Sequence, residues 1–384
     1  MNTETLRPIF GLTFPELQSQ LKALGMPAFR AKQIWDWVHV KGIAEPDKMT
    51  NLSKADREKL LSAFDWYIPS VTMQQQARDG VVKWLFKMAD GQEIESVLIP
   101  EERRVTLCVS SQVGCTLTCR FCHTGTQALA RNLSAAEIIA QVWLARRQLA
   151  DFSGKDVKRK LTNIVFMGMG EPLFNKEHVF QACHILMDPN GQGFGSRKIT
   201  ISSSGVVPQI PAIGEELGVN LAISLHAADD ETRTKIMPIN NKWDLDALMT
   251  SIKNFKLKER RRITWEYVML GGVNDTNEHA DRLVALIKDI PSLVNIIPFN
   301  PWPGSPFTCS DSKRIDAFAK RVDAAGVAVT VRKTRGEDIL AACGQLRSES
   351  SKRNTVSLDY PTVIAVYGNE KQRTRVQIEP LPSE

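Results

Sequence analysis

Three cysteines lie close together in one short segment of the chain. Cys115, Cys119 and Cys122 are separated by three and by two residues, directly after a run that is typical of a β-strand. Three thiolates are one ligand short of the four that close a structural zinc site or complete the coordination of a four-iron cluster. A cubane cluster held by three cysteines therefore keeps one iron open, and that iron can bind a second molecule. A zinc site completed elsewhere in the fold and a chance spacing are the alternatives.

The spacing of these cysteines resembles the motif of the radical S-adenosylmethionine (SAM) superfamily. The aromatic residue before the last cysteine, Phe121, fits the same motif. The resemblance implies a 4Fe–4S cluster whose ligands are Cys115, Cys119 and Cys122. It also implies SAM as the molecule that binds the open iron.

Polar residues and glycines follow several other predicted strands at the point where each strand ends. Ligands of parallel α/β sheets bind beyond these carboxyl ends. The segment 168–172 contains glycines that permit close backbone approach, and it resembles the superfamily's glycine-rich motif, in which Glu171 would bind the ammonium group of SAM. Any one of these residues alone is compatible with a structural role. Together they predict a cofactor site formed by Gly170, Glu171, Ser202, Ser224, Leu225, His226 and Asn300.

The elements that must position these residues alternate between strands and helices. Strands are predicted at 105–110, 161–167, 198–203, 218–225, 262–270, 294–298 and 327–332, and helices at 134–149, 177–186, 244–255, 277–288 and 312–325. Repeated βα units imply a parallel sheet with right-handed crossovers. About six units precede the last strand, so we predict the α/β fold class, with a partial (β/α)6 TIM-like radical SAM barrel over 105–346.

The residues before the barrel form two further predicted units. Residues 1–66 read as a small helical domain, since Thr13 and Glu16 have the spacing of a capping box ahead of leucines at helical spacing. A basic and aromatic mixture in this domain suits RNA, although core packing explains the aromatic residues equally well: Arg30, Lys32, Trp35, Trp37 and Lys41. Residues 67–104 read as a β-hairpin linker, with turn signals at Asp79-Gly80 and Asp90-Gly91.

Composition narrows the class of protein. The chain has 384 residues, a net charge of +6 and an odd number of cysteines, seven, which argues against a disulfide scaffold. No apolar run is long enough to span a membrane, and the N-terminus lacks the apolar core of a signal peptide, so we expect a cytoplasmic protein without membrane contact. The tail, 347–384, is rich in Ser, Lys and Arg and is expected to be poorly ordered.

Four segments extend the resemblance to one family within the superfamily. The segments 108–115, 224–226, 297–304 and 342–346 occur in the order found in the RlmN family of dual-specificity RNA adenine C2-methyltransferases, and the similarity covers roughly residues 10–346. It implies that Cys343 becomes an S-methylcysteine intermediate and that Cys108 resolves it through a transient disulfide. Glu93 and Glu95 share one face of a strand, so the pattern alone does not choose between them as proton acceptor. The resemblance favours Glu95.

The resemblance also implies a reaction and its partners. The family methylates an adenosine in 23S ribosomal RNA (rRNA) and one next to the anticodon of transfer RNA (tRNA). It uses two SAM molecules per turnover and a reducing electron donor such as flavodoxin. The nearest alternative is methylation at carbon 8 of adenine in rRNA, as in the related resistance enzymes, and a more distant one is a non-catalytic, metal-bearing RNA-binding protein. The preference between rRNA and tRNA and the oligomeric state are not readable from the sequence.

Overall fold

One sheet runs through the whole molecule. The computed structural model describes residues 6–152 and 159–347, and within them ten strands form this sheet in the order β14-β13-β12-β11-β10-β9-β6-β5-β4-β3. Its strands are β3 (Ser70–Gln76), β4 (Val82–Lys87), β5 (Glu93–Pro100), β6 (Val105–Cys108), β9 (Asn163–Phe166), β10 (Ile199–Ser203), β11 (Asn220–Ser224), β12 (Ile263–Met269), β13 (Ser292–Pro298) and β14 (Ala328–Val331).

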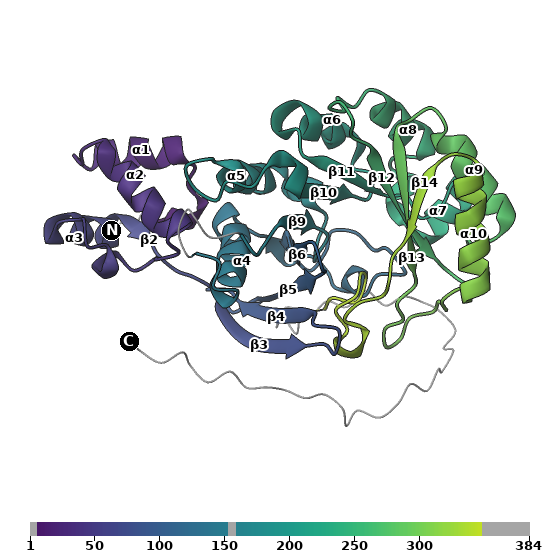
Figure 1. The fold of residues 1–384 in the computed structure, drawn as a ribbon, viewed down its shortest axis with the longest axis horizontal. Helices are drawn as coiled ribbons and strands as arrows, with labels where there is room; N and C mark the ends of the chain where they lie inside the picture. The colour runs from purple at the N-terminus through teal and green to yellow at the C-terminus, as the bar shows by residue number, and fades with distance from the viewer. Residues whose placement is uncertain (1–5, 153–158, 348–384) are drawn as a thin grey trace.

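Within this sheet, strand β6 and the strands from β9 to β14 pair in parallel and form the predicted partial barrel. Helices connect them and lie around the outside of the curved sheet (Figure 1). The predicted helices are present as α4 (Ala135–Gln148), α5 (Lys176–Met187), α8 (Leu245–Lys253), α9 (Asn277–Ile287) and α10 (Ser312–Ala324). Two short helices were not predicted, α6 (Ile210–Ala212) and α7 (Asp230–Ile236). The α/β barrel prediction is confirmed, with six βα units ahead of β14.

The segment predicted as a linker, 67–104, is part of the same sheet. Its strand β4 pairs antiparallel with both β3 and β5, and β5 pairs antiparallel with β6. The turns fall at the predicted Asp-Gly pairs, and both glycines have the positive φ that such turns need. This extension places Glu95 of β5 beside the first barrel strand.

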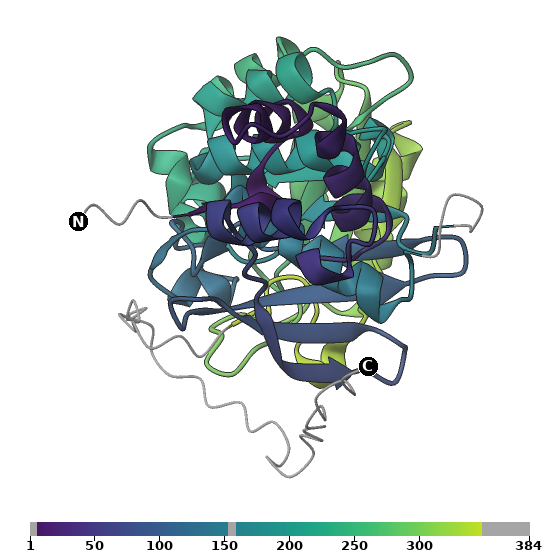
Figure 2. The ribbon, with the colours of Figure 1, turned by 90° about the vertical axis from the view of Figure 1, so that its left-hand side faces the viewer.

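Residues 6–66 form a small helical unit, which faces the viewer in Figure 2. Its helices are α1 (Phe14–Ala23), α2 (Phe29–Trp35) and α3 (Lys54–Ala63), and α2 continues as a π-helical turn over Asp36–Val40. The capping box of Thr13 and Glu16 is present. Trp35 and Trp37 are buried, so these aromatic side chains belong to the core and are not free to stack on RNA bases.

The helical unit shares its core with the barrel. The Phe10 ring packs edge-on against Trp143 of α4, with 5.5 Å between the ring centroids. Trp143 Nε1 donates to Val38 O at 2.9 Å, and Arg146 Nη1 donates to His39 O at 3.3 Å. Short two-stranded pairings complete the fold: β1 (Arg7–Pro8) with β2 (Phe64–Asp65), and β7 (Gln112–Val113) with β8 (Arg131–Asn132). The predicted tail, apart from Arg347, lies outside the described residues.

Candidate active site

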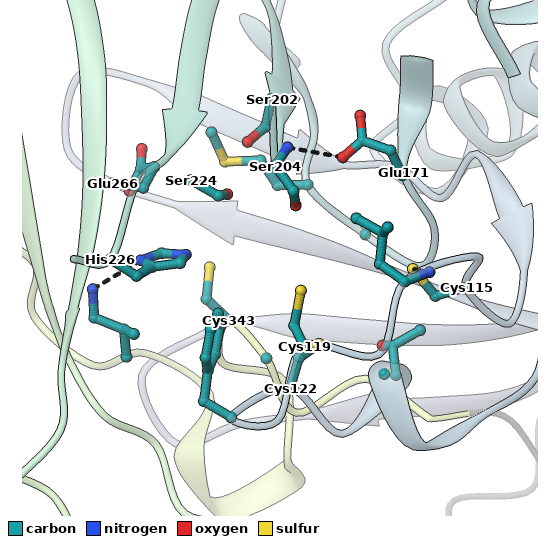
Figure 3. A pocket seen from close by; sticks show the side chains of 18 of the residues that line it. Cys115, Cys119, Cys122, Glu171, Ser202, Ser204, Ser224, His226, Glu266 and Cys343 are labelled. Atoms are coloured by element: carbon teal, nitrogen blue, oxygen red, sulfur yellow. Dashed lines mark hydrogen bonds between the residues drawn. The ribbon is translucent and has the colours of Figure 1, made fainter. Parts of the chain in front are cut away.

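A cavity lies at the carboxyl ends of the parallel strands, where ligands of this fold class bind. The three cysteines of the short motif line it together with Cys343, which is distant in sequence (Figure 3). Most of the predicted cofactor site lines the same cavity: Gly170, Glu171, Ser202, Ser224 and His226. Leu225 and Asn300 are not among its lining residues. Leu225 is buried, and Asn300 Nδ2 instead donates to the backbone carbonyl of Cys343 at 3.4 Å.

The arrangement of the three cysteines suits a cluster better than a single ion. In the described residues, no three His, Cys, Asp or Glu side chains converge closely enough to hold one metal ion. A single zinc ion requires such convergence, whereas a cubane takes each thiolate on a different iron. Cys115, Cys119 and Cys122 lie near enough to influence one another's ionisation, and they face one cavity. The donor set therefore fits a cluster with one open iron.

Backbone amides point at the thiols of the cysteine loop. Leu117 N donates to Cys115 Sγ at 3.3 Å. Burial raises the Cys122 pKa, and hydrogen bonds from the backbone of Gly125 and Thr124 oppose that rise. Gly125 N also donates to the Cys122 carbonyl at 3.0 Å. Burial raises the pKa of the Cys115 thiol to about 12, and burial together with the neighbouring cysteines raises the Cys119 pKa well above its ordinary value. These thiols stay protonated without a metal, so cluster binding must displace their protons.

The glycine-rich segment after β9 brings the backbone close to the cysteine loop. Gly170 has a φ of +99°, and a Cβ placed there would lie 2.5 Å from the Gln112 side chain. The carboxylate of Glu171 points into this corner, where Oε2 accepts from Ser204 N at 2.8 Å and Oε1 from Leu173 N at 3.2 Å. Burial raises the Glu171 pKa, so a cationic ligand would stabilise its ionised form.

His226 is held as a neutral imidazole at the end of β11. Its Nδ1 accepts from Val268 N at 3.0 Å, and its φ of +59° is a left-handed conformation that is uncommon for a residue with a side chain. Burial lowers its pKa to about 3, and Arg233 lowers it as well. The Phe121 ring of the cysteine loop packs edge-on against the imidazole, with centroids 4.7 Å apart.

The segment that carries Cys343 packs onto the cysteine loop. His123 N donates to Gly344 O at 2.7 Å, and Thr124 Oγ1 donates to Leu346 O at 2.6 Å. The Cys343 sulfur points into the cavity shared with Cys119, Ser224 and His226 (Figure 3). The tertiary structure therefore brings one further thiol to the three cysteines of the loop.

Cys108 and Glu95 lie beside this cavity, and neither is among its lining residues. Cys108 ends β6 as a buried free thiol close enough to Cys343 for their charges to interact. Burial, and secondarily Cys343, raise the Cys108 pKa to about 12. Glu95 is 5% exposed, with its carboxylate bound to Lys83 Nζ at 2.9 Å and to Arg347 N at 2.8 Å.

Four polar residues of the cavity were not predicted: Thr124, Ser204, Glu266 and Arg332. Arg332 follows β14 directly, so the rule of polar residues at strand ends would have found it. Glu266 is the one charged residue of strand β12, and a charged residue in a buried strand is itself a signal of function. Its Oε2 accepts from Asn295 Nδ2 at 2.7 Å, and burial raises its pKa.

No helix in the described part of the chain is long and apolar enough to cross a membrane.

Comparisons with known proteins agree with this geometry. The model of the radical SAM superfamily matches residues 109–284, and that of the ribosomal RNA large subunit methyltransferase N-terminal domain matches residues 8–64. A dual-specificity RNA methyltransferase RlmN from Parvibaculum lavamentivorans is 51% identical over 356 residues, which are 89% of each chain. Its counterpart from Magnetococcus marinus is 51% identical over 343 residues, covering 89% of this chain and 95% of that protein. Among solved structures, a radical SAM methyltransferase from Sphaerobacter thermophilus has a TM-score of 0.84 and 41% identity, and the match covers 89% of this chain and 99% of that one.

Proposed function

Because this chain belongs to the RlmN family of radical SAM, dual-specificity RNA methyltransferases, we propose that it methylates carbon 2 of adenine in RNA. The proposed substrates are an adenosine of 23S rRNA and the adenosine next to the anticodon of tRNA. The enzyme uses a 4Fe–4S cluster and SAM. One observation carries the proposal: a free thiol, Cys343, lines the same cavity as the three cysteines of the cluster motif.

The chemistry of the target explains why an extra thiol is needed. Carbon 2 of adenine lies between two ring nitrogens, is electron-poor and has no lone pair with which to attack a methyl sulfonium. Ordinary methyl transfer therefore fails at this carbon, whereas a carbon-centred radical adds to it. A thiol that first accepts a methyl group can then present that carbon as a radical.

The cofactor contacts follow from the cavity lining. Cys115, Cys119 and Cys122 would hold the cluster, and Glu171 would bind the ammonium group of SAM beside the cysteine loop. When bound, this pair supplies a deoxyadenosyl radical that removes a hydrogen atom from a methyl group. Ser202, Ser224 and His226 line the remaining wall, where they exclude water and orient the cofactor.

Cys343 is the proposed methyl carrier. Its sulfur takes a methyl group from one SAM molecule, and a second SAM molecule is consumed in activating that methyl group. The S-methylene carbon then bonds to carbon 2 of the base and links the protein to the RNA. The base must be extruded from its stack to reach the cavity, as for other enzymes that act on a base.

Glu95 and Cys108 are the proposed residues that complete the reaction. Glu95 accepts the proton of carbon 2, which requires its carboxylate to be freed from the contact with Arg347. As this proton leaves, the adduct gives up its one unpaired electron, which the cluster would take up. The Cys108 thiolate then attacks the Cys343 sulfur: an S–S bond forms, the bond between that sulfur and the methylene carbon breaks, and the freed carbon takes a proton, which completes the methyl group and releases the RNA. The raised pKa of Cys108 keeps this thiol protonated and unreactive until that stage.

The partners of the reaction are also proposed. The exposed basic residues of the helical unit, among them Lys22, Lys32 and Lys41, would contact RNA phosphates. A cytoplasmic reductant such as flavodoxin would deliver electrons to the cluster.

Identification of the modified base tests the proposal. The purified, anaerobically reconstituted protein is incubated with unmodified 23S rRNA and tRNA, SAM and a chemical reductant, and the digested nucleosides are compared with methyladenosine standards. We expect 2-methyladenosine from both RNAs. A product at carbon 8 would indicate the reaction of the resistance enzymes, and absence of any methylated adenosine would overturn the proposal.

A further inference from the structure

Arg332 carries its guanidinium into the candidate active site from the edge of the sheet. It follows β14, and its backbone N–H donates to Ile296 O at 2.8 Å, which continues the pairing of β14 with β13. Its side chain lines the cavity, and Nη1 donates a hydrogen bond to Cys343 Sγ at 2.9 Å. The guanidinium therefore contacts the sulfur that we propose as the methyl carrier.

Ionisable groups from three other elements lie near enough to this guanidinium for their charges to act on it. Glu266 comes from β12, Cys108 from β6 and Glu101 from the loop after β5. Cys343 raises the Arg332 pKa most and these three groups raise it further, while burial opposes them. Arg332 thus remains a cation throughout the neutral range.

We propose that Arg332 is a positioning residue for methyl loading: its hydrogen bond fixes the direction of the Cys343 sulfur and places a positive charge beside that sulfur when it attacks a methyl group. The thiolate, and not the thiol, is the nucleophilic form of cysteine. Hydrogen bonds to ionised partners are shorter and about twice as strong as those between neutral groups. The inference rests on the proposed function, in which this sulfur must attack a methyl group.

The loading step balances as a simple displacement. The Cys343 thiol loses its proton to solvent, and its sulfur forms a bond to the methyl carbon of SAM. The bond between that carbon and the sulfonium sulfur breaks, and its electron pair stays on the leaving S-adenosylhomocysteine. The product S-methylcysteine is a thioether, which is only a weak acceptor. Methylation therefore weakens the hydrogen bond and frees the guanidinium.

Two purely structural roles of Arg332 can be distinguished from the proposed positioning role. Arg335 anchors the chain between β14 and Cys343 to Asp79, with 2.7 Å between Arg335 Nε and Asp79 Oδ2. If Arg332 served only to anchor the segment, loss of Arg335 would have a similar effect. If it served only to neutralise Glu266, removing that carboxylate as well would restore function.

The experiment compares the wild type with Arg332→Met, Arg332→Lys, Arg335→Met and the double variant Arg332→Met/Glu266→Gln, each with its cluster reconstituted. The first readout is the rate at which Cys343 gains a methyl group from SAM without reductant, followed by peptide mass spectrometry. The second is the rate of Cys343 alkylation by iodoacetamide without SAM. We expect Arg332→Met to slow both about 10- to 100-fold, as for loss of one hydrogen bond to a charged group. Arg332→Lys should recover part of each rate.

The controls decide between the roles. Arg335→Met should behave like the wild type, and the double variant should stay as slow as Arg332→Met. Wild-type rates in Arg332→Met, equal slowing by Arg335→Met, or recovery in the double variant would overturn the inference. If Arg332→Met loses iron, the methylation and alkylation rates of Arg332→Lys are compared with those of the wild type instead. If the wild type never methylates Cys343, the proposed function fails, and the alkylation rates still decide whether Arg332 activates this sulfur.

Discussion

Lys83 Nζ lies 2.9 Å from Glu95 Oε1, and this ion pair is almost completely buried between neighbouring strands β4 and β5. Lys83 Nζ also donates to Leu340 O at 3.3 Å, and the other carboxylate oxygen of Glu95 accepts from Arg347 N. The proposed proton acceptor is therefore linked to both ends of the segment that carries Cys343. It binds Arg347 directly, and it is connected to Leu340 through Lys83. A shift of that segment would change the surroundings of Glu95.

Removal of Lys83 should move the pH dependence of methylation to higher pH. Burial raises the Glu95 pKa, and the charge of Lys83 opposes that rise. In Lys83→Met the opposing charge is absent, so the pKa rises further and a smaller fraction of Glu95 is ionised at any given pH. The rising limb of the pH–rate profile should shift upward, whereas Lys87→Met, an exposed lysine on the same strand, should leave it in place. An unshifted limb in Lys83→Met would show that Glu95 is not the acceptor.

Cys108→Ala should trap the RNA on the protein. Without the second thiol nothing attacks the Cys343 sulfur, so the thioether bond between protein and adenine persists. A nuclease-resistant protein–RNA band on denaturing gels, absent in the double variant Cys108→Ala/Cys343→Ala, is the expected result. Clean multiple turnover by Cys108→Ala would contradict the role proposed for this thiol.

Cys343→Ala should lose methylation and keep the cluster. Cys343 lines the cavity without belonging to the three-cysteine loop, so about four irons per chain should remain in the reconstituted protein. Cys309→Ala, which removes an exposed thiol, is the matched control and should retain activity. Loss of iron from Cys343→Ala would indicate that this thiol is a cluster ligand instead.

Gly170→Ala should impair SAM binding more than Gly272→Ala, a control at another glycine with positive φ. Gly170 and Gly272 both have positive φ, but only at Gly170 would a Cβ clash, at 2.5 Å from Gln112. Backbone strain should cost each variant about 1–2 kcal/mol of unfolding free energy, and overpacking should add about 1–3 kcal/mol in Gly170→Ala. Thermal denaturation and SAM binding by equilibrium dialysis measure the two effects. Equal behaviour of both variants would argue against close packing at Gly170.

Charge reversal on the helical unit should weaken RNA binding. Deletion of this unit would expose Trp143 and the shared core, so substitutions at exposed positions give a cleaner test. The triple variant Lys22→Glu/Lys32→Glu/Lys41→Glu should bind RNA more weakly. Its affinity should also depend less on salt: the slope of log affinity against log salt concentration should fall by up to about 0.7–0.9 for each phosphate contact that is lost. Glu at Lys313 and Lys320 of α10 provides the control. Equal affinities would assign RNA binding to another surface.

The local features of this protein were readable from its sequence. The cluster motif fits within one short loop, so its spacing alone indicates that the three thiols lie near one another. The alternation of strands and helices, and the capping box of Thr13 and Glu16 on α1, depend on neighbouring residues and were predicted close to their observed positions. The family resemblance added Cys108 and Cys343, which no local pattern distinguishes from the buried Cys183 or the exposed Cys309.

The contacts that assemble the site were decided by the tertiary structure. Thr124 and Leu346 are 222 residues apart, yet their hydrogen bond helps to hold the Cys343 segment on the cysteine loop. Glu93 and Glu95 have the same strand periodicity, but only Glu95 is buried against Lys83, since packing around β5 differs along its length. Arg332 reaches Cys343 only because β14 closes the parallel sheet beside β13. Such pairings depend on how distant elements pack, and the periodicity of a sequence specifies which face of an element is apolar without specifying which distant residue will meet it.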